Sequence, residues 1–568
     1  MTYAPPVAEQ RFVLDHVVRI GELAEHAPFS AATADLVDAI VEGAGAFAAG
    51  EYAPLNRIGD TVGARWRDGV VTMPEGFKAA YQAFVESGWG TISGPTEFGG
   101  QGLPYALATV VMEDLGSANM GFSLINMLTP GAIEALTAHG SPEQQATWLP
   151  KLITGEWNGT MNLTEPQAGS DVGALRTVAT PAGDGSWRIK GQKIYITFGE
   201  HDLTDNIVHL VLARTPGAPP GTKGISLFLV PKYRLNADGT PGAFNDVRCV
   251  SIEHKLGINA SPTCTLSFGD SDDCHGWLIG AEMGGMRAMF TMMNNARLNV
   301  GLQGVQIAER ATQQALGYAR DRMQLGKAII DHPDVRRMLI RMRALTQGAR
   351  ALIYYAAGQA DRAHLGDAAA RARLDLLTPL AKAWGTDIGV EVASLGVQVH
   401  GGMGFVEETG AAQHYRDIRI APIYEGTNGI QAADLVNRKL ALEGGAVLAG
   451  LIADIRAEAA EEAALMALVD AVERVARHML GNEASVEDRL AGSYPLTTML
   501  AVAVAGWLMA RQAAIAAASA GEPHFLAMKR VAARFFLDRI VPEAVGLEAA
   551  ARGGAELLYA LDAEALAA

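Results

Sequence analysis

The hydrophobic period of the sequence changes twice along the chain, and this change constrains the fold more than any other feature. Before about residue 157 and again after about residue 285, apolar residues recur every three or four positions, as in Ala32–Ala49, which is typical of amphipathic helices. Between these points the chain has short runs rich in β-branched and aromatic residues, punctuated by Gly, Pro and Asp. The runs are Trp187–Lys190, Ile194–Phe198, Ile207–Arg214, Gly224–Lys232 and Thr263–Phe268. The pattern predicts an α+β fold in which a central antiparallel β-domain lies between helical domains.

The length of 568 residues exceeds what one hydrophobic core normally supports, so two to four domains are expected. We predict an N-terminal helical domain with an N-terminal extension at 1–157, a β-domain at 158–285, a helical bundle domain at 286–443 and an additional, alanine-rich C-terminal helical domain at 444–568.

Local signals predict one helix start and two loops. In Ser141-Pro142-Glu143-Gln144, Ser141 is the expected N-cap, Pro142 occupies the first helical position and Gln144 closes a capping box. The segments 98–104 and 236–245 are predicted as loops, because glycine is frequent in both.

The charge and the cysteines exclude several classes of function. The formal net charge of −16 argues against nucleic acid as the main partner, because Lys and Arg drive binding to phosphates. Cys249, Cys264 and Cys274 are few, odd in number and without CxxC spacing, so neither a disulfide framework nor a metal site is expected. A reduced compartment fits these thiols best, and we expect a cytoplasmic protein.

No segment predicts secretion or insertion into a membrane. The N-terminal region carries Glu9, Arg11 and Asp15 and has no apolar stretch before a cleavage site, so no signal peptide is expected. The longest apolar run, Met499–Ala510, is too short to span a bilayer and predicts a buried helix. We therefore expect no stable membrane insertion.

Two segments of the β-domain contain residues suited to ligand binding. Met161–Asp171 is a loop rich in small residues, in which backbone N–H groups and the hydroxyls of Thr164 and Ser170 can hold a polar or phosphate-bearing ligand. In the strand that follows Gly191, two-residue alternation puts Tyr195 and Thr197 on one face, which suits a flat ring that needs hydrogen bonds at its edge. Taken alone, the first segment fits a turn equally well and the second a core strand.

Glu425 is the candidate general base. It follows the apolar run that ends at Tyr424 and precedes Gly426-Thr427-Asn428, which leads into a predicted helix. A carboxylate flanked by apolar residues just outside a helix N-terminus can accept a proton from a substrate. An isolated Glu in this place would more often bind helix amides, so the assignment depends on the other motifs.

Together these segments resemble the acyl-CoA dehydrogenase family. The chain contains, in order, LTEPxAGSD from Leu163, GQKxxIT from Gly191, RxxxGK from Arg322, QxxGGxGF from Gln398 and YEGTNxIQ from Tyr424. The resemblance covers roughly residues 30–440 and is greatest with the larger branch that includes 3-methylmercaptopropionyl-CoA dehydrogenase. It implies the acyl-CoA dehydrogenase-like fold, FAD as cofactor, and α,β-dehydrogenation of an acyl-CoA thioester to the trans-2-enoyl-CoA. The implied substrate is 3-methylmercaptopropionyl-CoA or another short- or medium-chain acyl-CoA.

The resemblance also implies roles for individual residues, with Glu425 as the catalytic base. Those implied to bind FAD are Met161, Leu163, Thr164, Ser170, Tyr195, Ile196, Thr197, Arg322, Gln398, Gly401, Gly402, Gly426 and Thr427. Those implied to contact the substrate are Ser170, Asn294, Arg297 and Tyr424. Ala296 stands where some subfamilies carry the catalytic Glu, which leaves Glu425 as the candidate. His332-Pro333 stands where relatives often have His-Gln, so one side-chain contact to FAD is expected to be missing.

The implied partners are an electron acceptor such as electron-transfer flavoprotein and a second copy of the chain, because the flavin site is expected to need residues of two subunits. Two alternatives remain open. In an acyl-CoA oxidase, reduced flavin passes its electrons to oxygen. A non-catalytic flavoprotein like the alkylation-response relatives would associate with DNA, but the intact Tyr-Glu-Gly-Thr motif and the acidic charge count against it.

Overall fold

The computed structural model describes residues 3–481 and 484–568, without the side chain of residue 294. By the contacts among its residues the described chain forms two compact units. One consists of residues 39–296, and the other of residues 3–38 together with residues 297–568.

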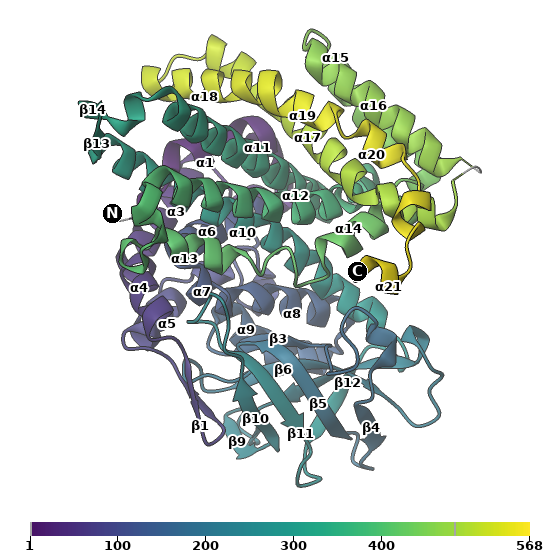
Figure 1. The fold of residues 1–568 in the computed structure, drawn as a ribbon. Coiled ribbons are helices and arrows are strands. Elements are labelled where there is room, and N and C mark those ends of the chain that lie inside the picture. The colour runs from purple at the N-terminus through teal and green to yellow at the C-terminus, as the bar shows by residue number, and fades with distance from the viewer. Residues whose placement is uncertain (1–2, 482–483) are drawn as a thin grey trace. The chain divides into compact units, whose positions relative to one another are not determined.

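The unit of residues 39–296 begins with helices and ends with strands (Figure 1). Its helices are α3 (Ala34–Phe47, which starts before the unit), α4 (Asn56–Thr61), α5 (Phe77–Glu86), α6 (Tyr105–Ala118), α7 (Met120–Ser123), α8 (Ile125–His139) and α9 (Pro142–Thr154). The predicted capping box is confirmed: the Ser141 hydroxyl accepts the N–H of Gln144 at 3.2 Å, and the Gln144 side chain accepts the N–H of Ser141 at 2.9 Å. Pro142 occupies the first turn, where its missing N–H costs no hydrogen bond.

The described strands of this unit form two hairpins and a larger sheet. One hairpin pairs β1 (Arg65–Arg67) with β2 (Val70–Thr72). The strands of the larger sheet are β3 (Asn158–Asn162), β4 (Val178–Pro181), β5 (Trp187–Thr197), β6 (Ile207–Arg214), β7 (Ile225–Pro231), β10 (Val247–Ile252), β11 (Thr263–Phe268) and β12 (His275–Ile279). Their order is β10-β11-β5-β12-β7-β6-β3, and β4 pairs with both β5 and β6.

Three features of the sheet differ from the prediction. The sheet is antiparallel except that β3 and β4 pair with β6 in the parallel direction. The two predicted runs Trp187–Lys190 and Ile194–Phe198 belong to one strand, β5, which pairs with β12 and β4 through its first half and with β11 through its second. The predicted loop 236–245 contains a strand, β9 (Pro241–Phe244), which pairs with β8 (Tyr233–Leu235). Glycine frequency therefore located a hairpin turn but overestimated its length.

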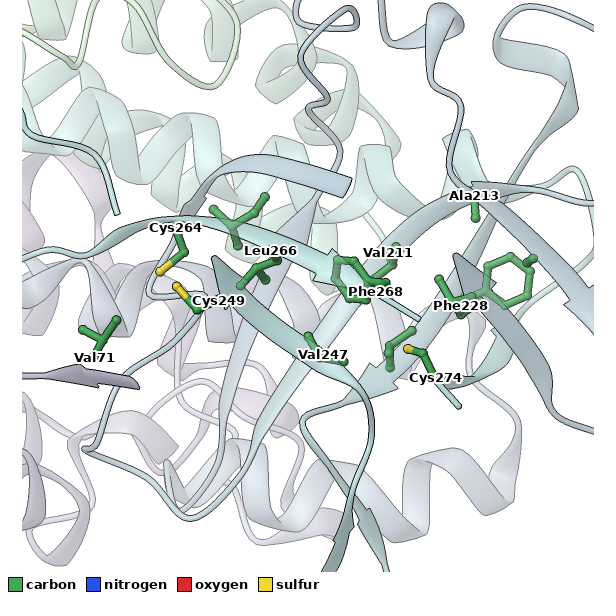
Figure 2. Packing of buried hydrophobic residues seen from close by; sticks show 14 residues of the cluster. Val71, Val211, Ala213, Phe228, Val247, Cys249, Cys264, Leu266, Phe268 and Cys274 are labelled. Atoms are coloured by element: carbon green, nitrogen blue, oxygen red, sulfur yellow. The ribbon is translucent and has the colours of Figure 1, made fainter. Parts of the chain in front are cut away.

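One face of the sheet buries a continuous apolar core (Figure 2). Phe228, Phe268 and Ile196 contribute large side chains from three different strands. Cys249 and Cys264 are fully buried free thiols whose side chains point toward each other in Figure 2. Burial raises the pKa of the Cys264 thiol, which makes it unreactive and suits a packing role.

The other unit is helical and contains the long helices of the chain. Its first part comprises α1 (Val7–Val13), α2 (Ile20–Ala24), α10 (Gly285–Asp321, from Arg297 onward), α11 (Pro333–His364), α12 (Ala368–His400), α13 (Ala411–Ile418) and α14 (Asn428–Asp434). A short hairpin of β13 (Met323–Gln324) and β14 (Lys327–Ala328) connects α10 to α11. Helices α10 and α12 pack so closely that a Cβ added at Gly304 would lie only 1.8 Å from the carbonyl oxygen of Gly385.

The alanine-rich end of the chain forms further helices in the same unit. These are α15 (Ala446–Ala459), α16 (Ala463–Leu480), α17 (Val486–Ala518), α18 (Pro523–Phe535), α19 (Val541–Val545), α20 (Glu548–Arg552) and α21 (Ala563–Leu566). Helix α17 packs against α11, α12 and α14 (Figure 1). Among the described helices, α17 alone is long and apolar enough to cross a membrane, and 72% of its most apolar stretch is buried inside the protein. A largely buried helix of this kind is also typical of a protein core.

Candidate active site

Glu425 lies in a tight turn between α13 and α14. Across the turn, the N–H of Asn428 donates to the carbonyl of Pro422 at 2.9 Å. The Thr427 hydroxyl accepts the N–H of Ile430 at 3.1 Å and thereby caps α14. Residues on both sides of Glu425 therefore fix the turn, which limits the positions that its side chain can take.

The backbone of Glu425 is strained. Its φ of 56° is in the left-handed region, and Gly426 follows with a φ of 80°. For a residue other than glycine this conformation costs on the order of 1 kcal/mol. The side-chain amide of Gln431 lies 3.4 Å from the carbonyl oxygens of both residues and helps to hold the turn. Strain of this kind persists where the surrounding structure over-determines a conformation, which is common at functional sites.

The environment of Glu425 gives its carboxyl group the pKa of a base that works near neutral pH. The residue is partly exposed in the single chain, yet the protein surrounds it enough that desolvation raises its pKa to about 7. The positive charges of Arg297 and Lys382 oppose this effect. A carboxylate with a pKa near the operating pH combines a useful ionised fraction with a strong tendency to accept a proton.

Arg297 is a buried cation whose charge acts on Glu425. It lies on α10 and is 6% exposed, and burial lowers its pKa while Asp434 and Glu425 oppose the shift. Its Nε has no hydrogen-bond partner among the residues that the structure describes. A buried guanidinium with a free donor suits an anionic or strongly polar ligand.

Lys382 is a second buried cation, which was not predicted from the sequence. It lies on α12 with no exposed surface, and its ammonium group donates to Oδ1 of Asn428 at 2.8 Å. Burial lowers its pKa to about 7, against the effect of Glu425 and Asp387. The available signal was a lysine within the otherwise apolar or small segment 376–385, since a lysine is almost never fully buried without a partner.

Two of the three other residues expected at the substrate, Tyr424 and Asn294, are placed differently. Tyr424 is partly buried, and its hydroxyl donates to Oε1 of Gln303 on α10. Burial raises the pKa of this hydroxyl, so it remains protonated. The side chain of Asn294 lies outside the described residues, and its expected role stays a prediction.

The small-residue loop of the β-domain is held by a buried ion pair. Lys193 on β5 donates to the Leu163 carbonyl at 3.0 Å and to Glu165 Oε1 at 2.8 Å. The hydroxyl of Thr177 donates to the same Glu165 oxygen at 2.6 Å, and the backbone N–H of Arg176 donates to the other, Oε2, at 2.6 Å. These interactions fix the loop from inside, so the predicted positions Met161, Leu163 and Thr164 lie on a rigid support.

The exposed face of β5 carries two of the three predicted flavin contacts. Tyr195 is 60% exposed with a left-handed φ of 60°, at a bulge where the register of β5 against β11 shifts, and Thr197 is partly exposed. Ile196 is 2% exposed and packs in the core. Its side chain is thus directed away from the face of Tyr195, which leaves only its backbone groups for a ligand. Ser170 is exposed in the loop after β3.

The remaining predicted residues lie at one end of the helical unit. The ring of Tyr318 on α10 stacks on that of His400 at the end of α12, with 4.5 Å between ring centroids. Arg322 follows the first helix, and Gly401 and Gly402 follow the second. All three are exposed, as is Gln398. His332 lies 3.3 Å from the Gln324 carbonyl of the hairpin, and Pro333 starts α11.

Among the described residues, no group of three or more His, Cys, Asp or Glu side chains is arranged to hold a metal ion.

Models of acyl-CoA dehydrogenase domains match most of the chain. The N-terminal domain matches residues 37–156, the middle domain 160–271 and the C-terminal domain 283–440. A further model, described as acetyl-CoA dehydrogenase C-terminal like, matches residues 446–562.

Two curated relatives are similar over most of their length. The 3-methylmercaptopropionyl-CoA dehydrogenase of Ruegeria pomeroyi is 47% identical over 96% of this chain and 97% of its own. A butyryl-CoA dehydrogenase of Syntrophomonas wolfei is 38% identical over 87% of each chain.

Solved structures share the fold. An acyl-CoA dehydrogenase from Bacillus anthracis, solved in complex with FAD, has a TM-score of 0.76 at 22% identity, over 94% of this chain and 89% of its own. Butyryl-CoA dehydrogenase from Megasphaera elsdenii has a TM-score of 0.60 at 26% identity, over 71% of this chain and 97% of its own. The predicted order of helical, β and helical domains with an additional C-terminal region is confirmed.

The expected enzyme class, an FAD-dependent oxidoreductase that acts on acyl-CoA, agrees with these matches. The chain belongs to the acyl-CoA dehydrogenase family.

Proposed function

We propose that this protein catalyses the FAD-dependent α,β-dehydrogenation of an acyl-CoA thioester, with Glu425 as the base that removes the α-proton. The observation that carries the assignment is the position of Glu425 in a strained turn, where burial raises its pKa to about 7 beside Arg297 and Lys382. Two hydrogens leave the substrate: a proton goes to the Glu425 carboxylate, and a hydride leaves from the β-carbon.

The residues around Glu425 lower the barrier to proton removal. An α-proton of a thioester is weakly acidic, so a carboxylate in water removes it slowly. Desolvation strengthens Glu425 as a base, and the nearby cations keep a fraction of it ionised at neutral pH. The buried Nε of Arg297, free among the described residues, provides a donor for the polar part of the substrate.

The exposed face of β5 fits a flavin. Tyr195 offers an exposed ring, and Thr197 offers a partly exposed hydroxyl two residues away. The backbone N–H of Ile194 donates to the Thr164 carbonyl at 2.9 Å, which places the small-residue loop next to this face. When bound there, FAD supplies the acceptor for the hydride.

We propose that the enzyme is a homodimer, because Arg322 and Gln398 lie far from Glu425 within one chain. Gln398 follows Lys382 by 16 residues on one helix, which corresponds to about 24 Å at the helical rise. Leu325 is 90% exposed beside Arg322, and Phe405 is 88% exposed after Gln398. Apolar residues exposed in this way are typical of an interface, at which a second copy can bring these residues to the flavin. Sedimentation equilibrium measures the oligomeric state directly.

The substrate that the relatives favour is 3-methylmercaptopropionyl-CoA or another short- or medium-chain acyl-CoA, since these acyl groups resemble those in the names of similar proteins. Electron-transfer flavoprotein is the proposed acceptor. Peroxide formation during turnover without it would favour the oxidase alternative. We place the enzyme in the cytoplasm without membrane insertion, which the three buried free thiols and the buried α17 support.

The test is the isosteric variant Glu425→Gln. It should retain FAD, yet the flavin absorbance should not bleach on addition of butyryl-CoA or 3-methylmercaptopropionyl-CoA. The matched control is Glu443→Gln, since Glu443 is also left-handed at a φ of 50° but is exposed. Normal bleaching in Glu425→Gln would refute the assigned base.

A further inference from the structure

A continuous hydrogen-bonded network connects the C-terminal helices to the turn that carries Glu425. It starts at Tyr494 on α17, within the additional C-terminal region. The Tyr494 hydroxyl donates to Oδ2 of Asp387 on α12 at 2.6 Å. The other oxygen of Asp387, Oδ1, accepts the side-chain N–H of Asn428 at 2.9 Å. Each oxygen of this carboxylate therefore has its own donor, which fixes its orientation.

Asn428 is the central member of the network. It is 3% exposed and is the first residue of α14, three positions after Glu425. Its Nδ2 donates to Asp387, and its Oδ1 accepts the ammonium group of Lys382 at 2.8 Å. The amide can have only this orientation, because a carboxylate cannot donate and an ammonium cannot accept.

Lys382 has few alternatives to this arrangement. It is fully buried, and its ammonium group donates to the side chain of Asn428. Helices α10 and α12 approach within backbone contact at Gly304 and Gly385, close in sequence to Lys382. The position of this cation therefore depends on Asn428, whose Nδ2 is oriented by Asp387 together with the Ala383 carbonyl and the Thr386 hydroxyl oxygen, each at 3.0 Å.

We infer that Tyr494 is a positioning residue, whose hydroxyl orients Asp387 and, through Asn428, holds the Lys382 ammonium near the base Glu425. The inference rests on the proposed function and gives the additional C-terminal helices a role in it. Asp387 and Tyr494 also line a surface hollow of about 510 Å³, so the outer end of the network lies at the protein surface.

Because of the charges around the network, each substitution in it is expected to raise the pKa of Glu425. Loss of the Tyr494 hydrogen bond raises the pKa of Asp387, which then carries less negative charge. A weaker anion at position 387 lowers the pKa of Lys382, because it supports the cation less. A less charged Lys382 opposes the desolvation of Glu425 less and raises its pKa. The other charged groups facing these residues stay unchanged in each variant, and they are Arg297, Arg419, Asp434 and Arg438.

The experiment measures the pH profile of flavin reduction by butyryl-CoA in single turnovers of the FAD-loaded enzyme. Tyr494→Phe should move the acid limb to higher pH by about half a unit, and Lys382→Met by about one unit or more. These shifts correspond to rates about three and about ten times lower below the limb, with wild-type rates approached above it. The acid limb of Asp387→Asn should lie between the limbs of Tyr494→Phe and Lys382→Met.

Tyr559→Phe is the matched control, because it removes a tyrosine hydroxyl from an exposed site in the same C-terminal region. Its limb should coincide with that of the wild type. Tyr494→Phe with an unmoved limb would overturn the inference, even if its melting temperature fell, since that combination indicates structural support alone. Bleaching by Glu425→Gln would instead refute the base itself, so the two failures are distinguishable.

Discussion

Flavin reduction by acyl-CoA should become about ten times faster between pH 6 and pH 8 in the wild-type enzyme. Only the ionised carboxylate of Glu425 can accept the α-proton, and burial raises its pKa to about 7 against the effect of Arg297 and Lys382. With this pKa, about a tenth of the molecules carry the ionised base at pH 6 and about nine tenths at pH 8. The ratio of these fractions is the expected change in rate.

The assay is stopped-flow bleaching of the FAD-loaded enzyme with saturating butyryl-CoA, in buffers of constant ionic strength. Glu443→Gln should follow the wild-type profile, because Glu443 is exposed. A rate that is constant from pH 6 to pH 8 and falls only below pH 5 would refute the reasoning. It would mean that Glu425 titrates like a carboxyl group in water and that burial does not strengthen it as a base.

Two further predictions concern stability. The folded-state pKa of Glu425 lies above its ordinary value of 4.5, so the ionised group costs stability above pH 7 and almost none near pH 4. Glu425→Gln should therefore melt at a higher temperature than the wild type at pH 8 and at nearly the same temperature at pH 4, by circular dichroism. Lys193→Met should lower the melting temperature and the FAD content, because it leaves Glu165 buried without its cation, a loss of about 3 kcal/mol. The double variant Lys193→Met/Glu165→Gln should regain part of the melting temperature and part of the FAD content. If it regains neither, the ion-pair explanation is contradicted.

The features that could be predicted from the sequence have local causes. The start of α9 follows from Ser141 and Gln144, which bind each other's backbone groups within one turn. Strands β6 and β11 have the predicted bounds, because nearly all their residues are apolar or β-branched. The turn around Glu425 was also recognisable, since its residues are adjacent in the chain.

The features that could not be predicted depend on contacts between distant segments. Strand β3 is fully buried, yet it contains Asn158, Thr160 and Asn162, so it lacks the apolar signal of a core strand. Several of its polar groups have partners inside the protein, such as the His209 ring on β6, 2.7 Å from the Thr160 hydroxyl, and the Asn162 amide, which donates to that hydroxyl at 2.9 Å. The network from Tyr494 to Lys382 likewise joins side chains from three helices, and no spacing within one helix reveals it.

A left-handed backbone does not by itself identify the catalytic residue. Glu443 and Leu325 share this conformation with Glu425, but both are exposed, and neither is surrounded by buried charges. Glu425 differs because its strained turn coincides with two buried cations, each of which would be costly to desolvate without a compensating anion. The site thus combines three unfavourable features: the strained turn, the buried cations and the desolvated acid. The charges offset one another most fully when Glu425 is ionised, which is the form that accepts the proton. The cations at Arg297 and Lys382 therefore explain how a group that burial drives toward its neutral form remains available as a base.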